Sequence, residues 1–295
     1  MSRLHEGEPE IDEALVRRLV AEQFPQWAGL PVARVRSGGT SNVIYRLGDG
    51  LSVRLPRIAA AAEDLAREDA WLPRLAPLLP TAVPEPVALG EADAAYPWAW
   101  AVHRWLDGEV PVPGRLEQPE ALAGELGAFV RALHGAGTAG GHAAYRSESL
   151  ASRDAATRAA LAAAADLVPD PGALLAVWES ALEAPDRPGE PVWIHADLQS
   201  GNMLLGPGGR LGAVIDFGCF GLGDPAVDLL PAWYVLPGGA RKELRAAAGA
   251  DEAMWARGRG WAVSVALMEL QYYRRRSPAM VAAAQRAVGG LLEGE

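Results

Sequence analysis

The chain has 295 residues, half of them hydrophobic, which is enough to bury one large core or two smaller ones. Its formal net charge of −10 argues against a nucleic-acid partner, because a phosphate backbone requires a basic face, and a cationic or neutral small ligand fits better. Cys219 is the only cysteine, which excludes an intramolecular disulfide and a multi-cysteine metal site. Apolar stretches stop well short of the roughly 20 residues of a membrane span, and the opening residues lack the apolar core of a secretory signal. We therefore expect a cytoplasmic protein without a membrane partner.

The first hundred or so residues alternate between helix and strand patterns. Apolar residues at helical spacing predict helices over residues 11–23 and 59–76. Short β-branched runs separated by glycine-containing turns predict five strands, at residues 32–35, 42–47, 51–55, 87–90 and 98–106. This part of the chain therefore reads as a five-stranded antiparallel sheet with one inserted helix.

The remainder of the chain is predicted to be mostly helical. Helices are expected from Pro119 to about His134, over residues 152–167 and 171–184, and from Pro225 to the C-terminus with breaks at Pro237 and Pro278. Only three short strands interrupt them, at residues 192–195, 203–205 and 211–215.

The strongest chemical signal is the sequence His-Ala-Asp-Leu-Gln-Ser-Gly-Asn at residues 195–202, followed by Asp-Phe-Gly at 216–218. Phosphoryl transfer needs an in-line hydroxyl and cations that neutralise the phosphate oxygens, and little covalent help from the protein. Asp197 can accept a hydrogen bond from the attacking hydroxyl and take its proton. Asn202 and Asp216 offer the oxygen ligands that Mg²⁺ prefers. This pattern predicts a magnesium-dependent phosphotransferase.

These segments resemble the catalytic and metal-binding segments of the aminoglycoside phosphotransferase family, small-molecule relatives of the protein kinases. Protein kinases usually carry His-Arg-Asp in this loop, whereas Ala196 replaces the arginine here, which favours the small-molecule branch. The resemblance implies an α+β, protein-kinase-like fold of two lobes. It implies an N-terminal nucleotide-binding lobe, an antiparallel sheet with one helix, over residues 1–106 with a hinge at about 101–106. A larger, mainly helical lobe for catalysis and substrate binding would span 107–295, with a helical insertion at about 140–190.

The resemblance also assigns nucleotide-binding residues in the first lobe. Ser37, Gly38, Gly39, Thr40 and Ser41 occupy the position of the hairpin that covers the phosphates. Arg54 stands where the family normally carries a cation for the α- and β-phosphates, and Glu68 matches the acid that pairs with it. Kinases generally use lysine there, so Arg54 is a departure, although Lys242 is the only lysine in a chain otherwise rich in arginine. Surface charges at both positions, or pairing with Asp69, remain open alternatives.

Other candidate residues carry weaker signals. His103 and Trp105 lie in the strand and hinge whose backbone would read the purine, and both side chains could equally be core residues. Asp228 falls in the first turns of a predicted helix and is interpreted as structural, with substrate contact as the alternative. Glu269 and Tyr272 are candidate substrate contacts that could equally be helix core and surface.

The resemblance implies ATP or GTP as co-substrate and Mg²⁺ as cofactor. It also implies a hydroxyl-bearing small molecule as acceptor, an aminoglycoside or related antibiotic inactivated by O-phosphorylation. One rival is a metabolic kinase that acts on an amino alcohol or a sugar. Another is a nucleotide-binding pseudokinase, suggested only by Arg54, and the intact Asp197, Asn202 and Asp216 argue against it.

Overall fold

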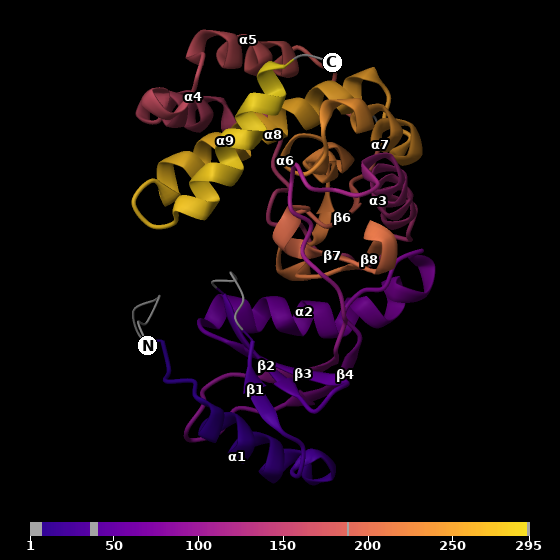
Figure 1. Ribbon diagram of the computed structural model, residues 1–295, viewed down its shortest axis with the longest axis vertical. Helices are drawn as coiled ribbons and strands as arrows, with labels where there is room; N and C mark the ends of the chain where they lie inside the picture. Colours follow the sequence, from indigo (N-terminus) through magenta and orange to yellow (C-terminus); the bar gives the residue numbers. More distant parts are fainter. Residues whose placement is uncertain (1–7, 36–40, 188, 294–295) are drawn as a thin grey trace. The chain divides into compact units, whose positions relative to one another are not determined.

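The computed structural model describes residues 8–35, 41–187 and 189–293 (Figure 1). Two compact units make up the chain. The first unit contains the described residues up to Leu78, together with Ala82–Asp107 and Ala213–Gly218. The second unit contains Leu79–Thr81, Gly108–Gly212 and the described residues from Cys219 onward.

The first unit is built on a five-stranded antiparallel sheet in the order β1-β2-β3-β5-β4. Its strands are β1 (Val32–Arg34), β2 (Asn42–Leu47), β3 (Leu51–Pro56), β4 (Pro86–Gly90) and β5 (Trp100–Arg104). Figure 1 shows α1 (Glu13–Gln23) and α2 (Ala59–Leu75) on opposite faces of this sheet. The predicted α+β class, with a five-stranded antiparallel sheet and one inserted helix, is confirmed.

The pleat of the sheet decides which side chains reach α2. Val53, Leu55 and Val102 belong to the apolar core that the sheet forms with α1. Because successive side chains of a strand point to opposite faces, Arg54 and His103 project from the other face, toward α2. The alternation of side chains along β3 and β5 therefore places the guanidinium of Arg54 and the imidazole of His103 on the face of the sheet that α2 covers.

The second unit is mainly helical. Its helices are α3 (Pro119–His134), α4 (Asp154–Ala163), α5 (Pro171–Leu182), α6 (Pro231–Tyr234), α7 (Arg241–Ala248), α8 (Glu252–Tyr273) and α9 (Pro278–Leu292). Strand β6 (Val192–Ile194) pairs antiparallel with β9 (Gly221–Gly223), and β7 (Met203–Leu205) pairs with β8 (Leu211–Val214), whose last two residues are assigned to the first unit.

The described residues of both units also include short 3₁₀ helices. They occur at Pro25–Trp27, Ala76–Leu78, Leu150–Arg153, Ala165–Leu167, Ser200–Asn202, Pro207–Gly209, Phe217–Cys219, Pro225–Leu229 and Gly238–Ala240.

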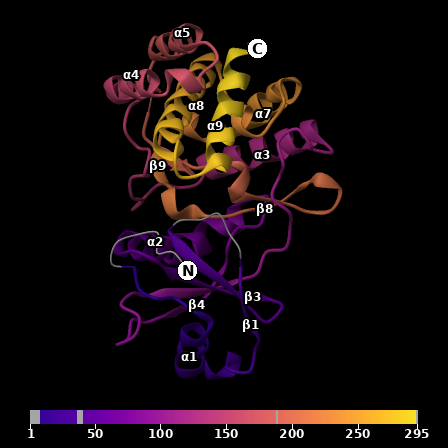
Figure 2. The same ribbon diagram turned by 60° about the vertical axis from the view of Figure 1, so that its left-hand side comes forward.

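Helix α8 is the central element of the second unit. It packs against α4, α5 and α9, as Figure 2 shows for α9, and most of its residues are buried. Glu269, one turn before its end, is among the buried ones. Helix α7 lies instead against α3, and it carries Lys242, whose side chain is 80% exposed. No helix within the described ranges is both long and apolar enough to span a membrane.

Three local predictions differ from the structure. The segment that begins at Pro225 is a 3₁₀ helix followed by the short α6, because Pro231 has no N–H with which to continue a helix. A break at Gly249, which adopts the left-handed conformation of a helix C-cap, separates α7 from α8. The strand β9 was not predicted.

Candidate active site

The loop between β6 and β7 carries the candidate catalytic residue Asp197. The side chain of Asp228 binds the backbone of this loop. The carboxylate of Asp228 accepts the N–H of His195 at 3.0 Å and of Ala196 at 2.9 Å, and it lies 3.0 Å from Nε2 of His134. Ala196 has a φ of 67°, a left-handed conformation that costs energy for a residue with a side chain. Asp228 is fully buried, so these contacts favour the structural interpretation of this residue over substrate contact.

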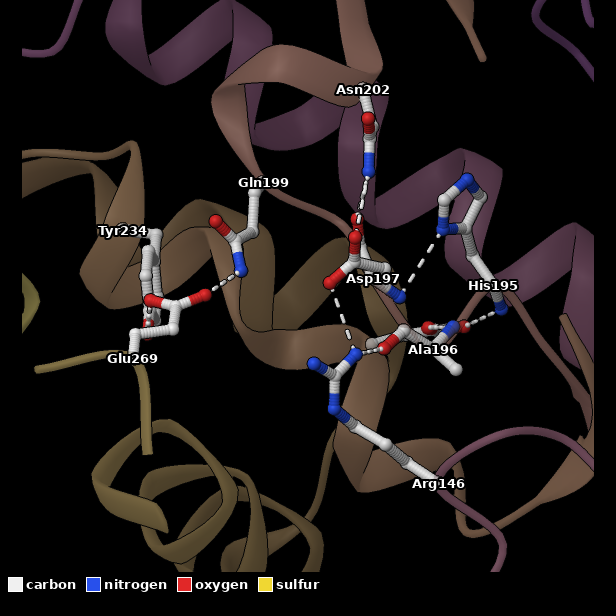
Figure 3. Close-up of polar contacts among 9 residues, drawn as sticks. Arg146, His195, Ala196, Asp197, Gln199, Asn202, Tyr234 and Glu269 are labelled. Carbon is white, nitrogen blue, oxygen red and sulfur yellow. Dashed lines mark hydrogen bonds and ion pairs between the residues drawn. The ribbon is translucent and has the colours of Figure 1, made fainter. Parts of the chain in front are cut away.

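Both oxygens of the Asp197 carboxylate are held by hydrogen-bond donors (Figure 3). Arg146 donates from Nη1 to Oδ1 of Asp197 at 3.0 Å, and the same nitrogen contacts the carbonyl oxygen of Ala196. Asn202 donates from Nδ2 to Oδ2 of Asp197 at 3.0 Å and to its carbonyl oxygen at 2.8 Å. The side chain of Asp197 remains 29% exposed, so its orientation is fixed while the carboxylate stays accessible to a ligand.

Glu269 forms a second polar cluster, which contacts the loop through Gln199. It accepts hydrogen bonds from Nε2 of Gln199 at 2.6 Å and from the hydroxyl of Tyr234 at 2.8 Å (Figure 3). Burial raises the pKa of Glu269, and the two hydrogen bonds oppose that shift. Tyr272, by contrast, is 58% exposed and stacks against the guanidinium of Arg276. Of the two candidate substrate contacts, only Tyr272 presents most of its side chain to solvent.

In the first unit, Arg54 connects two carboxylates. Its Nη1 donates to Glu68, and its Nη2 donates to Oδ1 of Asp216 at 3.1 Å, so its acidic partner on α2 is Glu68 and not Asp69. Burial raises the pKa of Glu68 to about 7 against the opposing effect of the Arg54 charge. Burial lowers the pKa of Arg54, but its two carboxylate neighbours outweigh this effect and the net shift is upward.

The structure describes only some of the remaining candidates for the nucleotide site. Four of them, Ser37, Gly38, Gly39 and Thr40, lie outside the described residues. Ser41 is exposed, and its carbonyl oxygen accepts the N–H of Arg57 at 2.9 Å. His103 is buried, with no hydrogen-bond partner for Nε2 among the described residues, and burial together with the charge of Arg54 lowers its pKa to about 3. Trp105 donates from Nε1 to Asp107 at 2.7 Å and lies under the guanidinium of Arg46.

The predicted metal ligands each keep an oxygen uncommitted. Asn202 uses its amide nitrogen for Asp197, and Figure 3 shows its amide oxygen turned away from that residue. Asp216 uses Oδ1 for Arg54, and its side chain is 48% exposed. Among the residues that the structure describes, no group of three or more His, Cys, Asp or Glu could hold a metal. Taken singly, each of these oxygens is of the kind that Mg²⁺ binds, since the ion usually takes one or two protein oxygens and completes its shell with phosphate oxygens and water.

Sequence reasoning missed four side chains of this site. Gln199 lies inside the motif and could have been singled out there. Arg146, His134 and Tyr234 carry no local signal, because they are distant in sequence from the loop that they or their partners support. Only the fold brings them together.

Comparisons with known proteins agree with this geometry. A family model described as "Phosphotransferase enzyme family" matches residues 32–261. The structure resembles that of aminoglycoside 2'-phosphotransferase-IIIa in complex with GDP, with a TM-score of 0.71 and 17% identity over 96% of this chain and 99% of that one.

A GDP and kanamycin complex of APH(2")-IIIa gives a TM-score of 0.67 at 17% identity, over 94% and 98% of the two chains. Macrolide 2'-phosphotransferase MphH from Brachybacterium faecium gives 0.62 at 22% identity, over 96% and 98%. A search of curated proteins gave no match. Identities this low establish the fold alone, which is the protein-kinase-like fold of these enzymes. The match to the family model covers most of the sequence, and the chain belongs to the phosphotransferase enzyme family.

Proposed function

We propose that the chain transfers the γ-phosphate of ATP or GTP to a hydroxyl group of a small-molecule antibiotic, an aminoglycoside or a related compound. The observation that carries this proposal is the Asp197 carboxylate, which is fixed by two donors and is still accessible on the motif loop. A kinase-type phosphotransferase needs such a carboxylate to orient the acceptor hydroxyl.

The proposed step involves one bond made and one broken. The acceptor oxygen bonds to the γ-phosphorus while the bond between that phosphorus and the β–γ bridging oxygen breaks, leaving a nucleoside diphosphate. The hydroxyl proton passes to the carboxylate of Asp197 and from there to water. When bound, Mg²⁺ neutralises phosphate oxygens, and Asn202 and Asp216 would hold it.

The two units have separate functions in this proposal. The first unit would bind the nucleotide through Arg54, held in place by Glu68, with Ser37–Ser41 covering the phosphates and the segment of His103 and Trp105 reading the base. The second unit would supply Asp197 and the acceptor site, where Tyr272 and Glu269 are candidate contacts. A cytoplasmic location, where nucleoside triphosphates are abundant, is part of the same proposal.

An antibiotic acceptor is supported by the kinds of protein that share the fold. The similar structures include enzymes whose names specify aminoglycosides and a macrolide, and one of them is a complex with kanamycin. Glu269, whose carboxylate is bonded to the neutral groups of Gln199 and Tyr234, would favour a cationic acceptor group nearby.

An acceptor panel tests the proposal. The purified chain is incubated with Mg²⁺ and either ATP or GTP together with kanamycin, gentamicin, streptomycin or a macrolide, and each acceptor is examined by mass spectrometry. We expect the mass of one phosphoryl group to appear on at least one acceptor and not with Asp197→Ala. Absence of a phosphorylated product with every pair of nucleotide and antibiotic would refute the antibiotic proposal.

A further inference from the structure

Arg146 contacts the catalytic loop from the end of a segment that is held by backbone hydrogen bonds. Residues 142–145 lie beside β9, where Leu222 donates its N–H to the carbonyl of His142 at 2.6 Å and accepts that of Ala144 at 3.0 Å. Tyr145 donates its N–H to the carbonyl of Cys219 at 3.0 Å. This segment extends the small sheet of β6 and β9 and ends at Arg146.

Close packing fixes the position of this segment. A Cβ atom on Gly221 would lie 2.5 Å from the backbone nitrogen of Ala144, so the approach of the two backbones requires glycine there. The ring of His142 packs edge-on against Trp193 and Phe220, and its Nε2 lies 3.0 Å from the carbonyl oxygen of Phe220. Arg146 therefore projects from a rigid base, not from a loosely attached loop.

The guanidinium of Arg146 holds both the backbone and the side chain of the catalytic loop. One nitrogen, Nη1, contacts the carbonyl of Ala196, the residue in the left-handed conformation, and Oδ1 of Asp197. With Asn202 on the other oxygen, the Asp197 carboxylate cannot rotate without losing a hydrogen bond to a charged or amide donor. The Arg146 side chain is 13% exposed, so solvent offers little compensation for a lost contact.

Among the described residues, the hydrogen bonds of the Arg146 guanidinium come from one of its three nitrogens, Nη1. Neither Nε nor Nη2 of Arg146 makes a hydrogen bond within the described residues. A purely structural arginine at this depth would normally use more of its five donors. The hydrogen bonds of Nη1 go to Asp197 and to the residue before it, and the guanidinium carbon lies 5.5 Å from the ring centroid of Tyr145.

We infer that Arg146 is a positioning residue for phosphoryl transfer, which fixes the Asp197 carboxylate in the orientation that accepts the hydroxyl of the acceptor. This inference rests on the proposed function. A displacement of about 1 Å at a reacting group can cost roughly a hundredfold in rate, so a residue that controls orientation acts on kcat and not on substrate affinity.

Arg146→Ala and Arg146→Lys test the inference, with the acceptor panel above and Mg²⁺ with ATP or GTP. For Arg146→Ala we expect kcat to fall roughly a hundredfold, with unchanged KM for nucleotide and acceptor. Added guanidinium should restore part of the rate, because the cavity left by the side chain accepts the same donor. Arg146→Lys should retain more activity than the alanine variant, since a single nitrogen of Arg146 makes both contacts.

Arg153→Ala is the matched control. Arg153 belongs to the same unit, and its side chain is 19% exposed and bonded to Ser264 and Glu148, without contact to Asp197. Its replacement should lower the melting temperature without a change in kcat that guanidinium restores. The inference is overturned if Arg146→Ala keeps parental kcat, raises only KM, or loses activity that neither guanidinium nor lysine recovers. A parent chain that phosphorylates no acceptor would instead overturn the proposed function, and the inference with it.

Discussion

Two arginines, Arg54 in the first unit and Arg146 in the second, each hold a carboxylate that the proposed chemistry uses, and they do so differently. Arg54 spreads two nitrogens over two carboxylates, Glu68 and Asp216. Arg146 directs one nitrogen to a carbonyl and a carboxylate of adjacent residues. The first arrangement requires the planar fork of a guanidinium, whereas the second requires only a cation at one point. Substitution by lysine should therefore separate the two sites.

The largest expected effect is that of Asp197→Ala, which removes the group that Arg146 holds. We expect the chain to fold and bind nucleotide normally while phosphoryl transfer falls roughly a hundred- to ten-thousandfold, the contribution of a positioned general base. Single-turnover rates and nucleotide titration measure the two quantities separately. Near-parental turnover would remove Asp197 from the mechanism and leave the Arg146 contact without a catalytic purpose.

Asp216→Asn tests the carboxylate shared between Arg54 and the proposed metal. The amide keeps an oxygen and loses the charge, so we expect Mg²⁺-dependent nucleotide binding to weaken by at least the roughly tenfold to hundredfold that loss of a supporting contact costs at metal sites. Calorimetric titration of nucleotide with and without Mg²⁺ is the measurement. Equal affinities for parent and variant under both conditions would assign Asp216 a structural function.

Arg54→Lys tests the two-nitrogen arrangement directly. One ammonium cannot span Glu68 and Asp216, so one charge-assisted hydrogen bond, about 1.5 kcal/mol or roughly tenfold in nucleotide KM, should be lost. The measurement is the steady-state kcat and nucleotide KM of Arg54→Lys, compared with those of Arg146→Lys. Parental KM and kcat in Arg54→Lys would mean that arginine at this position reflects only the scarcity of lysine in the chain.

The smallest expected effect concerns an ion pair of the first unit, Arg18 and Asp93, that takes no part in the proposed chemistry. Asp93 accepts a hydrogen bond from Arg18 at 2.7 Å and the N–H groups of Ala95 and Tyr96, which lower its pKa from 3.8 to about 2. A lowered carboxyl pKa gives stability that is present above the unfolded value and is lost as the pH falls toward the folded one. Asp93→Asn, whose amide oxygen keeps the turn, should lose stability less steeply than the parent between about pH 4 and pH 2, as urea midpoints would show. If the urea midpoints of parent and variant fell equally steeply with pH, the lowered pKa of Asp93 would be contradicted.

The regular segments of the fold were predictable because their patterns are local. The helix at residues 119–134 and the strand at 42–47 have the bounds that the sequence predicts. Strand β9 was not predictable, since Gly-Leu-Gly offers no alternation of side chains and forms only where β6 and the segment before Arg146 enclose it. A local sequence pattern can identify a helix or a strand, but it does not show which strands pair when they are far apart in the sequence.

The candidate site divides in the same way. Asp197, Asn202 and Asp216 were predicted because short motifs indicate their chemistry, and Glu68 was predicted because the resemblance to the family implies an acid that pairs with Arg54. Arg146 precedes Asp197 by 51 residues, and no spacing rule connects them. Short motifs can therefore predict the residues proposed to contact substrate and metal, whereas the residues that orient them are recognised only from the fold.

The position of Lys242 has a practical consequence for handling the protein. Its ammonium is the single lysine amine of the chain, and it stands well exposed on α7, which packs against α3 and contributes no residue to the proposed site. Because arginine does not react with amine-directed reagents at neutral pH, such reagents should attach a dye, surface or carrier at Lys242 or at the α-amino group of the chain. In both cases the catalytic loop is left unmodified.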